Sequence, residues 1–264
     1  MTKITLLTAC YNSAATIRDT LKSIEVQTYA NIEHIIVDGA SKDNTLEVVK
    51  AEGRRVGRVV SGPDKGIYDA YNKGLALATG EVIGFLNSDD FYAHPRVIEQ
   101  VMAKFDADPS LDAVHANLVY VDRDDVSKVT RLWRSQKSTA KRIQRGFYPA
   151  HPTLFLRRRV YERAGGFDLS YRMAADGEFM GRIFGRFGIT DAHVDDIWVI
   201  MRDGGTTGGN WRSIARQNSE LRRGLRANGI KSSPTMFLVA KIIDRTLQRS
   251  RARNVVLPPL GFEP

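Results

Sequence analysis

The chain has 264 residues, of which 42% are hydrophobic and 26% charged, so it is long enough to bury a large core as a globular protein. Its single cysteine, Cys10, excludes an internal disulfide and fits a reducing compartment. No segment approaches the roughly 20 apolar residues of a membrane span, and the N-terminus lacks the apolar region of a secretory signal, so we expect a cytoplasmic protein.

The formal net charge of +9 comes from 39 lysines and arginines against 30 acidic residues, and it is unevenly distributed. Residues 131–163 hold ten basic side chains and one acidic one, and residues 211–254 hold eleven basic and two acidic ones. Such clusters indicate an anionic partner. Composition alone leaves open whether this is a membrane surface, a phosphorylated substrate or nucleic acid.

The first part of the chain alternates short apolar strands with amphipathic helices, which predicts βα units around a mainly parallel sheet. Ser13 is the expected cap of the first helix, and Ser41 or Asp43 that of the second. Strands are expected at residues 4–9, 35–37, 58–60 and 82–86, and helices at 17–24, 46–49, 66–78 and 97–105.

The character of the sequence changes after residue 105. Residues 114–121 and 126–133 read as two strands joined by a polar turn, which indicates a mixed sheet. Residues 151–156 and 194–201 are predicted as further strands, and 176–186 as a helix. The tail is helical in pattern and basic, so we expect one domain over residues 1–209 and a basic helical extension over 210–264.

The strand at 82–86 runs directly into Asn87-Ser88-Asp89-Asp90. Two unit charges about 4 Å apart at an effective dielectric near 20 repel by roughly 4 kcal/mol. A hard divalent cation such as Mg²⁺ or Mn²⁺ would relieve this repulsion, and such ions keep positions open for substrate phosphates. The alternative for an isolated Asp-Asp pair is a solvated turn.

Polar residues also follow the first two strands, in 9–12 and 37–43. The ends of parallel strands share one edge of the sheet, where doubly wound folds bind nucleotides. Asp38 could therefore accept hydrogen bonds from a base N–H or a ribose hydroxyl. The alternative for Asp38 is an Asx-turn.

The order and spacing of four segments resemble family-2 glycosyltransferases over residues 4–205. These enzymes have the GT-A fold, invert the sugar's configuration and use nucleotide-activated sugars. The segments are Thr8-Ala9-Cys10-Tyr11-Asn12, Val37-Asp38-Gly39-Ala40-Ser41, Gly62-Pro63-Asp64-Lys65-Gly66-Ile67-Tyr68-Asp69-Ala70-Tyr71-Asn72-Lys73-Gly74 and Leu86-Asn87-Ser88-Asp89-Asp90. The resemblance implies an α/β fold of the nucleotide-diphospho-sugar transferase type. Residues 1–95 would then be the nucleotide-sugar-binding half and 96–209 the acceptor-binding half.

The resemblance also implies roles for residues in these segments. Asp38 would recognise the base or ribose, Asp64 would seat the nucleotide, and Lys65 would meet a phosphate or a sugar hydroxyl. For the Mn²⁺ or Mg²⁺ ion, Asp90 is the expected direct ligand, with Asp89 as a further ligand or a contact to sugar or ribose. The remaining donor-binding candidates are Thr8, Tyr11, Asn12 and Asn87.

An acidic residue follows the Gly-Gly-Phe-Asp stretch at 165–168 in this family, which points to Asp176 as the general base, with Glu178 as a weaker candidate. The alternative for Asp176 is a helix cap. His151, Gly205 and Thr206 are candidate contacts to the acceptor or the diphosphate. For Tyr68, Asn72 and Gly74 we expect roles in helix packing and capping.

Residues of the tail form an apolar helical stripe with basic neighbours. This pattern suits a helix in an anionic lipid interface, at the inner face of the cell membrane, and equally a helix packed on the domain. The stripe consists of Met236, Val239, Ala240, Ile243 and Leu247, and the basic residues are Lys241, Arg245, Arg249, Arg251 and Arg253.

The function predicted from these observations is transfer of a sugar from a UDP-, GDP- or dTDP-sugar to a saccharide or lipid-linked acceptor in polysaccharide or glycolipid biosynthesis. A nucleotidyltransferase is an alternative, although residues 9–15 contain neither the glycine nor the lysine of a phosphate loop. A basic nucleic-acid-binding module is another, although few aromatic residues interleave the basic ones, so no nucleic acid is expected. A donor-binding relative without catalysis is the third.

Overall fold

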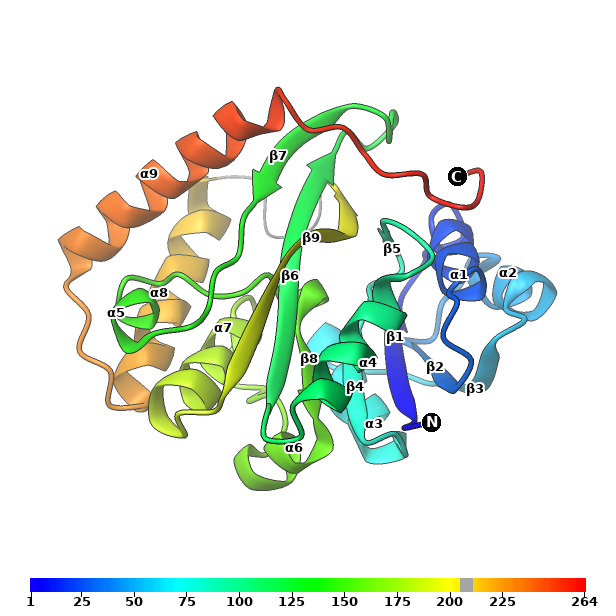
Figure 1. The fold of residues 1–264 in the computed structure, drawn as a ribbon, viewed down its shortest axis with the longest axis horizontal. Coiled ribbons are helices and arrows are strands. Elements are labelled where there is room, and N and C mark those ends of the chain that lie inside the picture. The colour runs from blue at the N-terminus through cyan, green and yellow to red at the C-terminus, as the bar shows by residue number, and fades with distance from the viewer. Residues whose placement is uncertain (205–210) are drawn as a thin grey trace.

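The computed structural model describes residues 1–204 and 211–264, except for the side chains of residues 211–213. Nine strands within these residues form one sheet in the order β3-β2-β1-β4-β8-β6-β9-β5, with β7 paired to β6 (Figure 1). They are β1 (Ile4–Cys10), β2 (Ile32–Asp38), β3 (Val56–Ser61), β4 (Val82–Phe85), β5 (Asp90–Tyr92), β6 (Ala113–Val121), β7 (Val129–Trp133), β8 (Phe155–Arg157) and β9 (Asp191–Arg202).

The sheet is mixed and mainly parallel, which confirms the predicted fold class. Strands β3, β2, β1 and β4 run parallel to one another. Strand β8 is antiparallel to both β4 and β6, so it joins two halves whose main strands run in the same direction. Strands β6 and β9 are parallel, whereas β5 and β7 pair antiparallel with β9 and β6.

Helices cover both faces of the parallel half because successive residues of β1 point to opposite sides. Leu7 faces α3, where a Cβ on Gly74 would lie 3.1 Å from it. Leu6 joins the cluster on the other face, with residues of α1 and α4. The α-helices are α1 (Ile17–Glu25), α2 (Thr45–Glu52), α3 (Ile67–Leu77), α4 (Val97–Ala107), α5 (Ala140–Gln144), α6 (Arg158–Ala164), α7 (Ala175–Met180), α8 (Trp211–Ala227) and α9 (Pro234–Ala252).

Two predictions about helix caps meet different outcomes. The prediction for Ser13 is wrong: α1 begins after Thr16, and the Ser13 hydroxyl lies 2.8 Å from the Ser88 hydroxyl in the loop after β4. The backbone carbonyl of Ser13 accepts the N–H groups of the turn that precedes α1. Asp43 lies one residue before the N-cap of α2, Asn44, and its carboxylate accepts the Thr45 N–H at 3.1 Å, so it supports the first turn of the helix from outside the cap position.

The strand predicted at 151–156 is wrong in its first half. His151–Thr153 form one 3₁₀ turn and β8 begins only at Phe155. Pro152 lacks the N–H that a strand ladder requires, and the Thr153 hydroxyl donates to two buried carbonyls. The helix predicted at 176–186 is α-helical only in its first part, α7, because Gly181–Arg186 form a π-helix (η2) that continues it.

The C-terminal extension packs on the domain. Helix α8 lies against α7, and α9 lies along β7 with Phe237 buried. After α9 the chain runs back over the sheet to α1 (Figure 1), where Phe262 meets Phe91 and the Lys22 ammonium donates to the Glu263 carbonyl at 2.9 Å.

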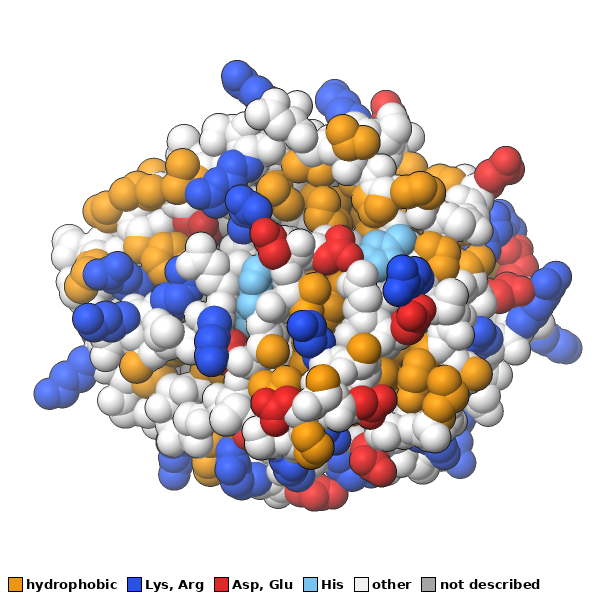
Figure 2. Space-filling view, in the orientation of Figure 1, with side chains coloured by type: hydrophobic (Ala, Val, Ile, Leu, Met, Phe, Trp, Pro, Cys, Tyr) orange, Lys and Arg blue, Asp and Glu red, His pale blue; other side chains and the backbone are white. Residues whose placement is uncertain are grey.

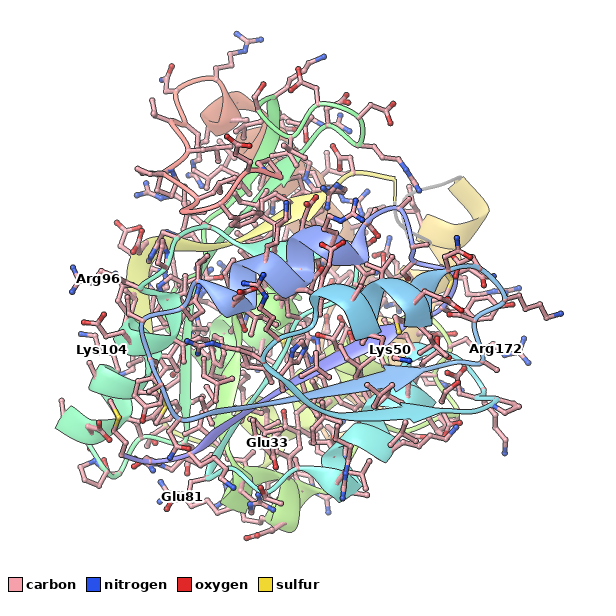
Figure 3. All side chains as sticks on the ribbon, turned by 90° about the vertical axis from the view of Figure 1, so that its right-hand side faces the viewer. Glu33, Lys50, Glu81, Arg96, Lys104 and Arg172 are labelled. Carbon is pink, nitrogen blue, oxygen red and sulfur yellow. The ribbon has the colours of Figure 1, made fainter. Side chains whose placement is uncertain are left out.

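None of the helices in the described residues is long and apolar enough to span a membrane. Charged side chains project from the surface of the molecule, among them Arg96 and Lys104 near α4 and Arg172 before α7 (Figure 3).

Candidate active site

A carboxylate, an aromatic ring and a glycine meet where β1, β2 and β3 end. A Cβ on Gly39 would lie 2.7 Å from Asp64 Oδ2 and 3.4 Å from Tyr11 Cδ2, so only glycine allows this approach. The Tyr11 side chain is 60% exposed and Asp64 is half-buried. An exposed ring beside an accessible carboxylate offers a stacking surface and a hydrogen-bond acceptor to a planar polar ligand.

Asp38 lies at the same edge but is only 1% exposed. Its carboxylate accepts the Ser61 hydroxyl at 2.6 Å, together with the backbone N–H and the hydroxyl of Ser41. Burial raises its pKa, but these hydrogen bonds outweigh burial and lower it overall. The Asx-turn of the alternative interpretation does not form, because the carboxylate accepts the N–H of the residue three positions on rather than two. A direct contact between Asp38 and a nucleotide would require one of the serines to move.

Two other donor-binding candidates hold the loops of this edge together. The prediction for Thr8 is wrong: its side chain is fully buried, and its hydroxyl lies 3.1 Å from His34 Nε2. Asn12 adopts a left-handed φ of 49°, and its side-chain oxygen accepts the Lys42 N–H at 2.8 Å. Lys65 is exposed at the start of the loop before α3.

The two carboxylates after β4 have different surroundings. Asp89 is half-buried, whereas Asp90 is fully buried as the first residue of β5. Asp90 Oδ2 accepts the Asn87 amide at 3.0 Å, and its Oδ1 has no hydrogen-bond partner within the described residues. The prediction of Asp90 as the direct metal ligand is therefore not supported, because an ion could not reach it without rearrangement. Asp89 is the accessible carboxylate.

The charges of this pair are costly in the absence of a counter-ion. Burial, and next the charge of Asp89, raise the pKa of Asp90 well above its usual range. Burial also raises the pKa of Asp89. Among the described residues, no group of three or more His, Cys, Asp or Glu side chains is arranged to hold a metal ion. Asp89 alone nevertheless fits an ion of the Mg²⁺ type, which takes one or two protein carboxylates and completes its shell with substrate oxygens and water.

Arg202, at the end of β9, fixes the position of Asp89. Its guanidinium donates to the Asp89 backbone carbonyl at 3.0 Å and pairs with the Asp19 carboxylate in α1. The sequence interpretation missed this residue because the predicted strand ended at Met201. A basic side chain at the last position of the final strand is the signal that could have identified it.

Asp176 lies in the first turn of α7, half-buried. The Tyr68 hydroxyl of α3 donates to Asp176 Oδ1 at 2.9 Å. Burial, and next the charge of Asp176, raise the pKa of Tyr68 well above its usual range, so the phenol stays protonated. The alternative of Asp176 as a helix cap finds no support, because α7 begins after Ala174 and has no side-chain cap.

Helix α3 connects Asp176 with the Asp89 loop. Tyr71, one turn after Tyr68, donates its hydroxyl to the Asn87 side-chain oxygen, and the centroids of the two tyrosine rings lie 6.1 Å apart. The packing role expected for Tyr68 is therefore incomplete, and Tyr71 was missed although it stands in the same motif. The i, i+3 spacing that places both hydroxyls on one face could have indicated this.

Two further candidates, His151 and Glu178, are both buried. His151 is 8% exposed, with ring centroids 5.3 Å from Phe85 and 5.7 Å from Tyr71, and burial lowers its pKa although Asp176 acts to raise it. Glu178 is buried and bonded to Arg182 at 2.8 Å and Asn228 at 2.9 Å, so its prediction as a second base or contact is wrong. Gly205 and Thr206 lie outside the described residues.

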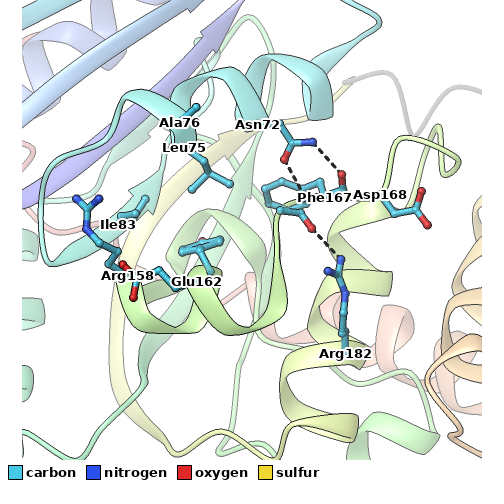
Figure 4. A pocket seen from close by; sticks show the side chains of 11 residues that line it. Asn72, Leu75, Ala76, Ile83, Arg158, Glu162, Phe167, Asp168 and Arg182 are labelled. Carbon is cyan, nitrogen blue, oxygen red and sulfur yellow. Dashed lines mark hydrogen bonds between the residues drawn. The ribbon is translucent and has the colours of Figure 1, made fainter.

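The loop before α7 is fixed from two sides (Figure 4). The Asn72 amide of α3 makes hydrogen bonds of 2.8 Å with both the N–H and the carbonyl of Phe167, and Arg182 donates to the Gly166 carbonyl. These residues line a cleft of about 490 Å³ between α3 and α6. Asn72 thus holds the segment that leads to Asp176, as the expected packing role implies.

The mixed, mainly parallel sheet flanked by helices, with polar loops at the ends of its parallel strands, is an α/β fold of the GT-A type. Residues 5–165 match the model of the family described as glycosyl transferase family 2. The chain belongs to this family, a class of glycosyltransferases that use nucleotide-activated sugars.

Two curated relatives illustrate the family. The chain is 30% identical over 176 residues to a PGL/p-HBAD biosynthesis glycosyltransferase of Mycobacterium tuberculosis, which is 66% of each protein. It is 35% identical over 102 residues to the UDP-Glc:alpha-D-GlcNAc-diphosphoundecaprenol beta-1,3-glucosyltransferase WfaP of Escherichia coli, covering 38% of this chain and 41% of WfaP. The chain therefore spans less than two thirds of either relative's length.

Two solved structures share the fold. S. aureus TarS 1–349 in complex with UDP superposes with a TM-score of 0.67 at 19% identity, over 88% of this chain and 66% of that one. The mannosyltransferase PcManGT from Pyrobaculum calidifontis, in complex with GDP-Man and Mn²⁺, superposes with a TM-score of 0.64 at 19% identity, over 98% and 77%.

Proposed function

We propose that this protein transfers a sugar from a nucleoside-diphosphate sugar to an acceptor hydroxyl, with inversion and with Asp176 as the general base. The observation that carries the proposal is the pair of α3 tyrosines that holds Asp176 on one side and Asn87 of the Asp89 loop on the other. A base must lie within hydrogen-bond reach of the acceptor hydroxyl, opposite the leaving group. The Tyr68 hydroxyl orients the Asp176 carboxylate for that task.

In this proposal the donor's nucleoside lies at the ends of β1–β3. The base stacks on the exposed ring of Tyr11, and Asp64 accepts a hydrogen bond from the base or ribose. Asp38 keeps the loop after β2 in shape, and Asn12 holds that loop against the loop after β1. The structural neighbours bind UDP and GDP-Man, which supports a UDP- or GDP-sugar as donor.

A divalent cation belongs to the proposal through Asp89. When bound, Mn²⁺ or Mg²⁺ would neutralise charge on the departing diphosphate. Asp89 would be its protein ligand and Arg202 would hold the Asp89 backbone in place. The Mn²⁺ in the PcManGT complex supports this choice of ion.

The acceptor we propose is lipid-linked, and α9 would bring the enzyme to the lipid surface. Four apolar side chains of this helix, which we call the α9 stripe, are 42–54% exposed, and apolar atoms gather over α9 at the upper left of Figure 2. An exposed apolar stripe with basic neighbours suits the interface of an anionic bilayer. WfaP acts on a diphosphoundecaprenol-linked sugar. The α9 stripe consists of Met236, Val239, Ile243 and Leu247.

The family match decides between the candidate functions. It favours glycosyl transfer over both a nucleotidyltransferase and a nucleic-acid-binding module. A donor-binding protein without catalysis differs from the proposal in a single measurement, which is turnover.

The test is transfer from a panel of UDP-, GDP- and dTDP-sugars, with and without Mn²⁺, by the wild type and by Asp176→Asn. We expect the variant to lose at least about 100-fold in turnover, the contribution of a positioned base, while nucleotide binding stays intact. Asp106→Asn is the matched control, because Asp106 is exposed on α4. Normal turnover by Asp176→Asn would refute its role, and inactivity of the wild type towards every donor would refute the transferase.

A further inference from the structure

A basic cleft lies beside the candidate active site, between β7 and helices α8 and α9. It encloses about 230 Å³. Two carboxylates, Asp203 and Asp244, line it, and cations outnumber them. The lining cations are Arg131, Arg134, Arg142, Arg202, Lys241 and Arg245.

Two of these cations have acidic partners elsewhere. Arg134 pairs with Asp195 at 3.2 Å, and Arg202 pairs with Asp19. The other four, which we call the cleft cations, have no carboxylate within 4.0 Å among the described residues. The cleft cations are Arg131, Arg142, Lys241 and Arg245.

Neutral groups take the place of acidic partners around these cations. The Arg131 guanidinium donates to the Gln248 side-chain oxygen at 2.9 Å and lies 3.9 Å from the Tyr120 ring centroid. Arg142 donates to the Gln136 side-chain oxygen at 2.6 Å. Asp244, one of the two carboxylates that line the cleft, accepts a hydrogen bond from the Gln248 side-chain amide at 2.7 Å.

The pKa of Lys241 reflects the excess of positive charge in the cleft. Burial lowers the pKa of Lys241 to about 8, and the charges of Arg245 and Arg131 act in the same direction. Asp244 and the more distant Asp176 offset this only in part. Several cations that share one cleft with fewer carboxylates are characteristic of a site that binds an anion.

A buried tyrosine forms part of the wall of the cleft. Tyr148 is 6% exposed and lines the cleft, and its hydroxyl has no hydrogen-bond partner within the described residues. The hydroxyl oxygen lies 4.0 Å from the position of a Cβ on Gly181 and is itself enclosed, so a ligand in the cleft would not reach it without a movement of the side chain. The cations, rather than this hydroxyl, are therefore the groups of the cleft that an anion can contact.

The position of the cleft relates it to the acceptor side of the reaction. One wall contains Arg202, which holds the Asp89 backbone. Another contains Leu221, which packs on Gly177 next to Asp176. The nucleoside edge at Tyr11 and Asp64, in contrast, is formed by the ends of β1–β3.

We propose that this cleft binds a phosphate or diphosphate group of the acceptor through the cleft cations. Assigning the group to the acceptor rests on the proposed transferase function. Several cations converging on one site match the two or three charges of a diphosphate better than a single carboxylate, and arginine forks bind phosphate oxygens in pairs. A lipid or saccharide diphosphate held here would present its sugar hydroxyl towards Asp176.

The experiment is a calorimetric titration of the full-length protein with geranyl diphosphate in the presence of saturating UDP and Mn²⁺, which fill the donor site. We expect binding that weakens with added salt, and no binding of geraniol. Lys241→Gln/Arg245→Gln should weaken binding by at least about tenfold, because charged hydrogen bonds are lost. Arg251→Gln/Arg253→Gln loses the same charge on exposed residues outside the cleft lining and should bind as the wild type.

Three results would overturn the proposal. Equal binding by both double variants would mean that the cleft cations do not contact the probe. Binding of geranyl diphosphate that occurs without UDP but is absent at saturating UDP would assign the cleft to the donor. If Lys241→Gln/Arg245→Gln weakened binding to phosphatidylglycerol vesicles but left the binding of geranyl diphosphate unchanged, the cleft would be assigned to a lipid headgroup. These assays need no turnover, so they separate this proposal from the proposed transferase function. Inactivity with all donors, together with binding of geranyl diphosphate that Lys241→Gln/Arg245→Gln weakens, would refute the transferase alone.

Discussion

Asp89 and Asp90 are neighbours in sequence, but the fold gives them different chemistry. Asp90 begins β5, which pairs with β9, so its side chain is enclosed by strands far apart in the sequence. Asp89 precedes the strand, keeps part of its side chain accessible, and has its carbonyl held by Arg202. We therefore propose Asp89, rather than Asp90, as the direct metal ligand that the sequence pattern indicates.

This revised assignment predicts opposite outcomes for two isosteric substitutions. Asp89→Asn should weaken Mn²⁺-dependent UDP binding by at least about tenfold, because a charged ligand is lost. Asp90→Asn should leave that binding nearly unchanged, since an amide oxygen can still accept the hydrogen bond from Asn87. Calorimetry with UDP in Mn²⁺ and in EDTA measures both. A selective loss in Asp90→Asn would restore the original assignment.

The sequence could not distinguish such cases because burial depends on pairing partners beyond any local window. Thr8 and Tyr11 belong to one motif, yet the Thr8 hydroxyl turns into the core towards His34 and the Tyr11 ring turns out to solvent. Asp38 ends β2 and Asp64 lies in the loop after β3, but only Asp38 is enclosed by serines, namely Ser41 of the following loop and Ser61 at the end of β3. The motifs place these residues at one edge of the sheet, and the contacts between loops decide which of their side chains are accessible there.

At the scale of elements, the periodicity of apolar residues predicts a helix or strand correctly where the element is long enough to show one buried face. The parallel strands β1–β4 and helices α1–α4 follow the predicted order, because alternation and helical spacing reflect burial directly. The short strand β5, the helix α5 and the 3₁₀ turn at His151 were missed or mistaken. These elements are three to five residues long and depend on tertiary partners, which a periodic pattern over so few residues cannot reveal.

Helix α9 illustrates an element with two different faces. Phe237 and Gln248 fix it to the domain, the latter through Arg131. The α9 stripe points to solvent. Both sequence interpretations of this helix are thus compatible, since it packs on the domain and still presents an apolar surface.

Substituting the α9 stripe should reduce binding to anionic membranes. Burial of a CH₂ group contributes about 0.8 kcal/mol, so Val239→Ser/Ile243→Ser should weaken partitioning into phosphatidylglycerol vesicles by at least about tenfold. Vesicle sedimentation measures this change. Val256→Ser removes an apolar side chain that is 88% exposed outside the helix and serves as the control. Equal sedimentation of all three proteins would show that α9 does not contact the bilayer.

At the scale of the whole molecule, one continuous sheet carries both the nucleoside edge and the basic cleft. Strand β8 joins the two halves, and the segment after α9 crosses the sheet to reach α1. Buried titratable groups within this sheet connect its stability to pH. His34 of β2 is the clearest case, since its side chain lies between β1 and the rest of the core with Thr8 as its hydrogen-bond partner.

Acidification from pH 7 to pH 5 should therefore destabilise the protein through His34. Burial lowers the pKa of His34 to about 3 from 6.5, so below pH 6.5 the unfolded chain takes up a proton that the folded chain excludes. The stability contributed by neutral His34 is fully present above pH 6.5 and is lost progressively as pH falls from 6.5 towards 3. Over the interval from pH 7 to pH 5 the loss amounts to about 2 kcal/mol.

The comparison of wild type with His34→Gln isolates this contribution, because Asp38, whose pKa is lowered, titrates below this interval. The buried His151 acts in the same direction as His34 but is common to both proteins. Urea unfolding at pH 7 and pH 5 gives the free energy of unfolding of each. Wild type should lose about 2 kcal/mol more than the variant between the two pH values. Equal losses would show that the imidazole of His34 becomes protonated without unfolding, so that the β1–β2 pair admits a charge that its burial should exclude.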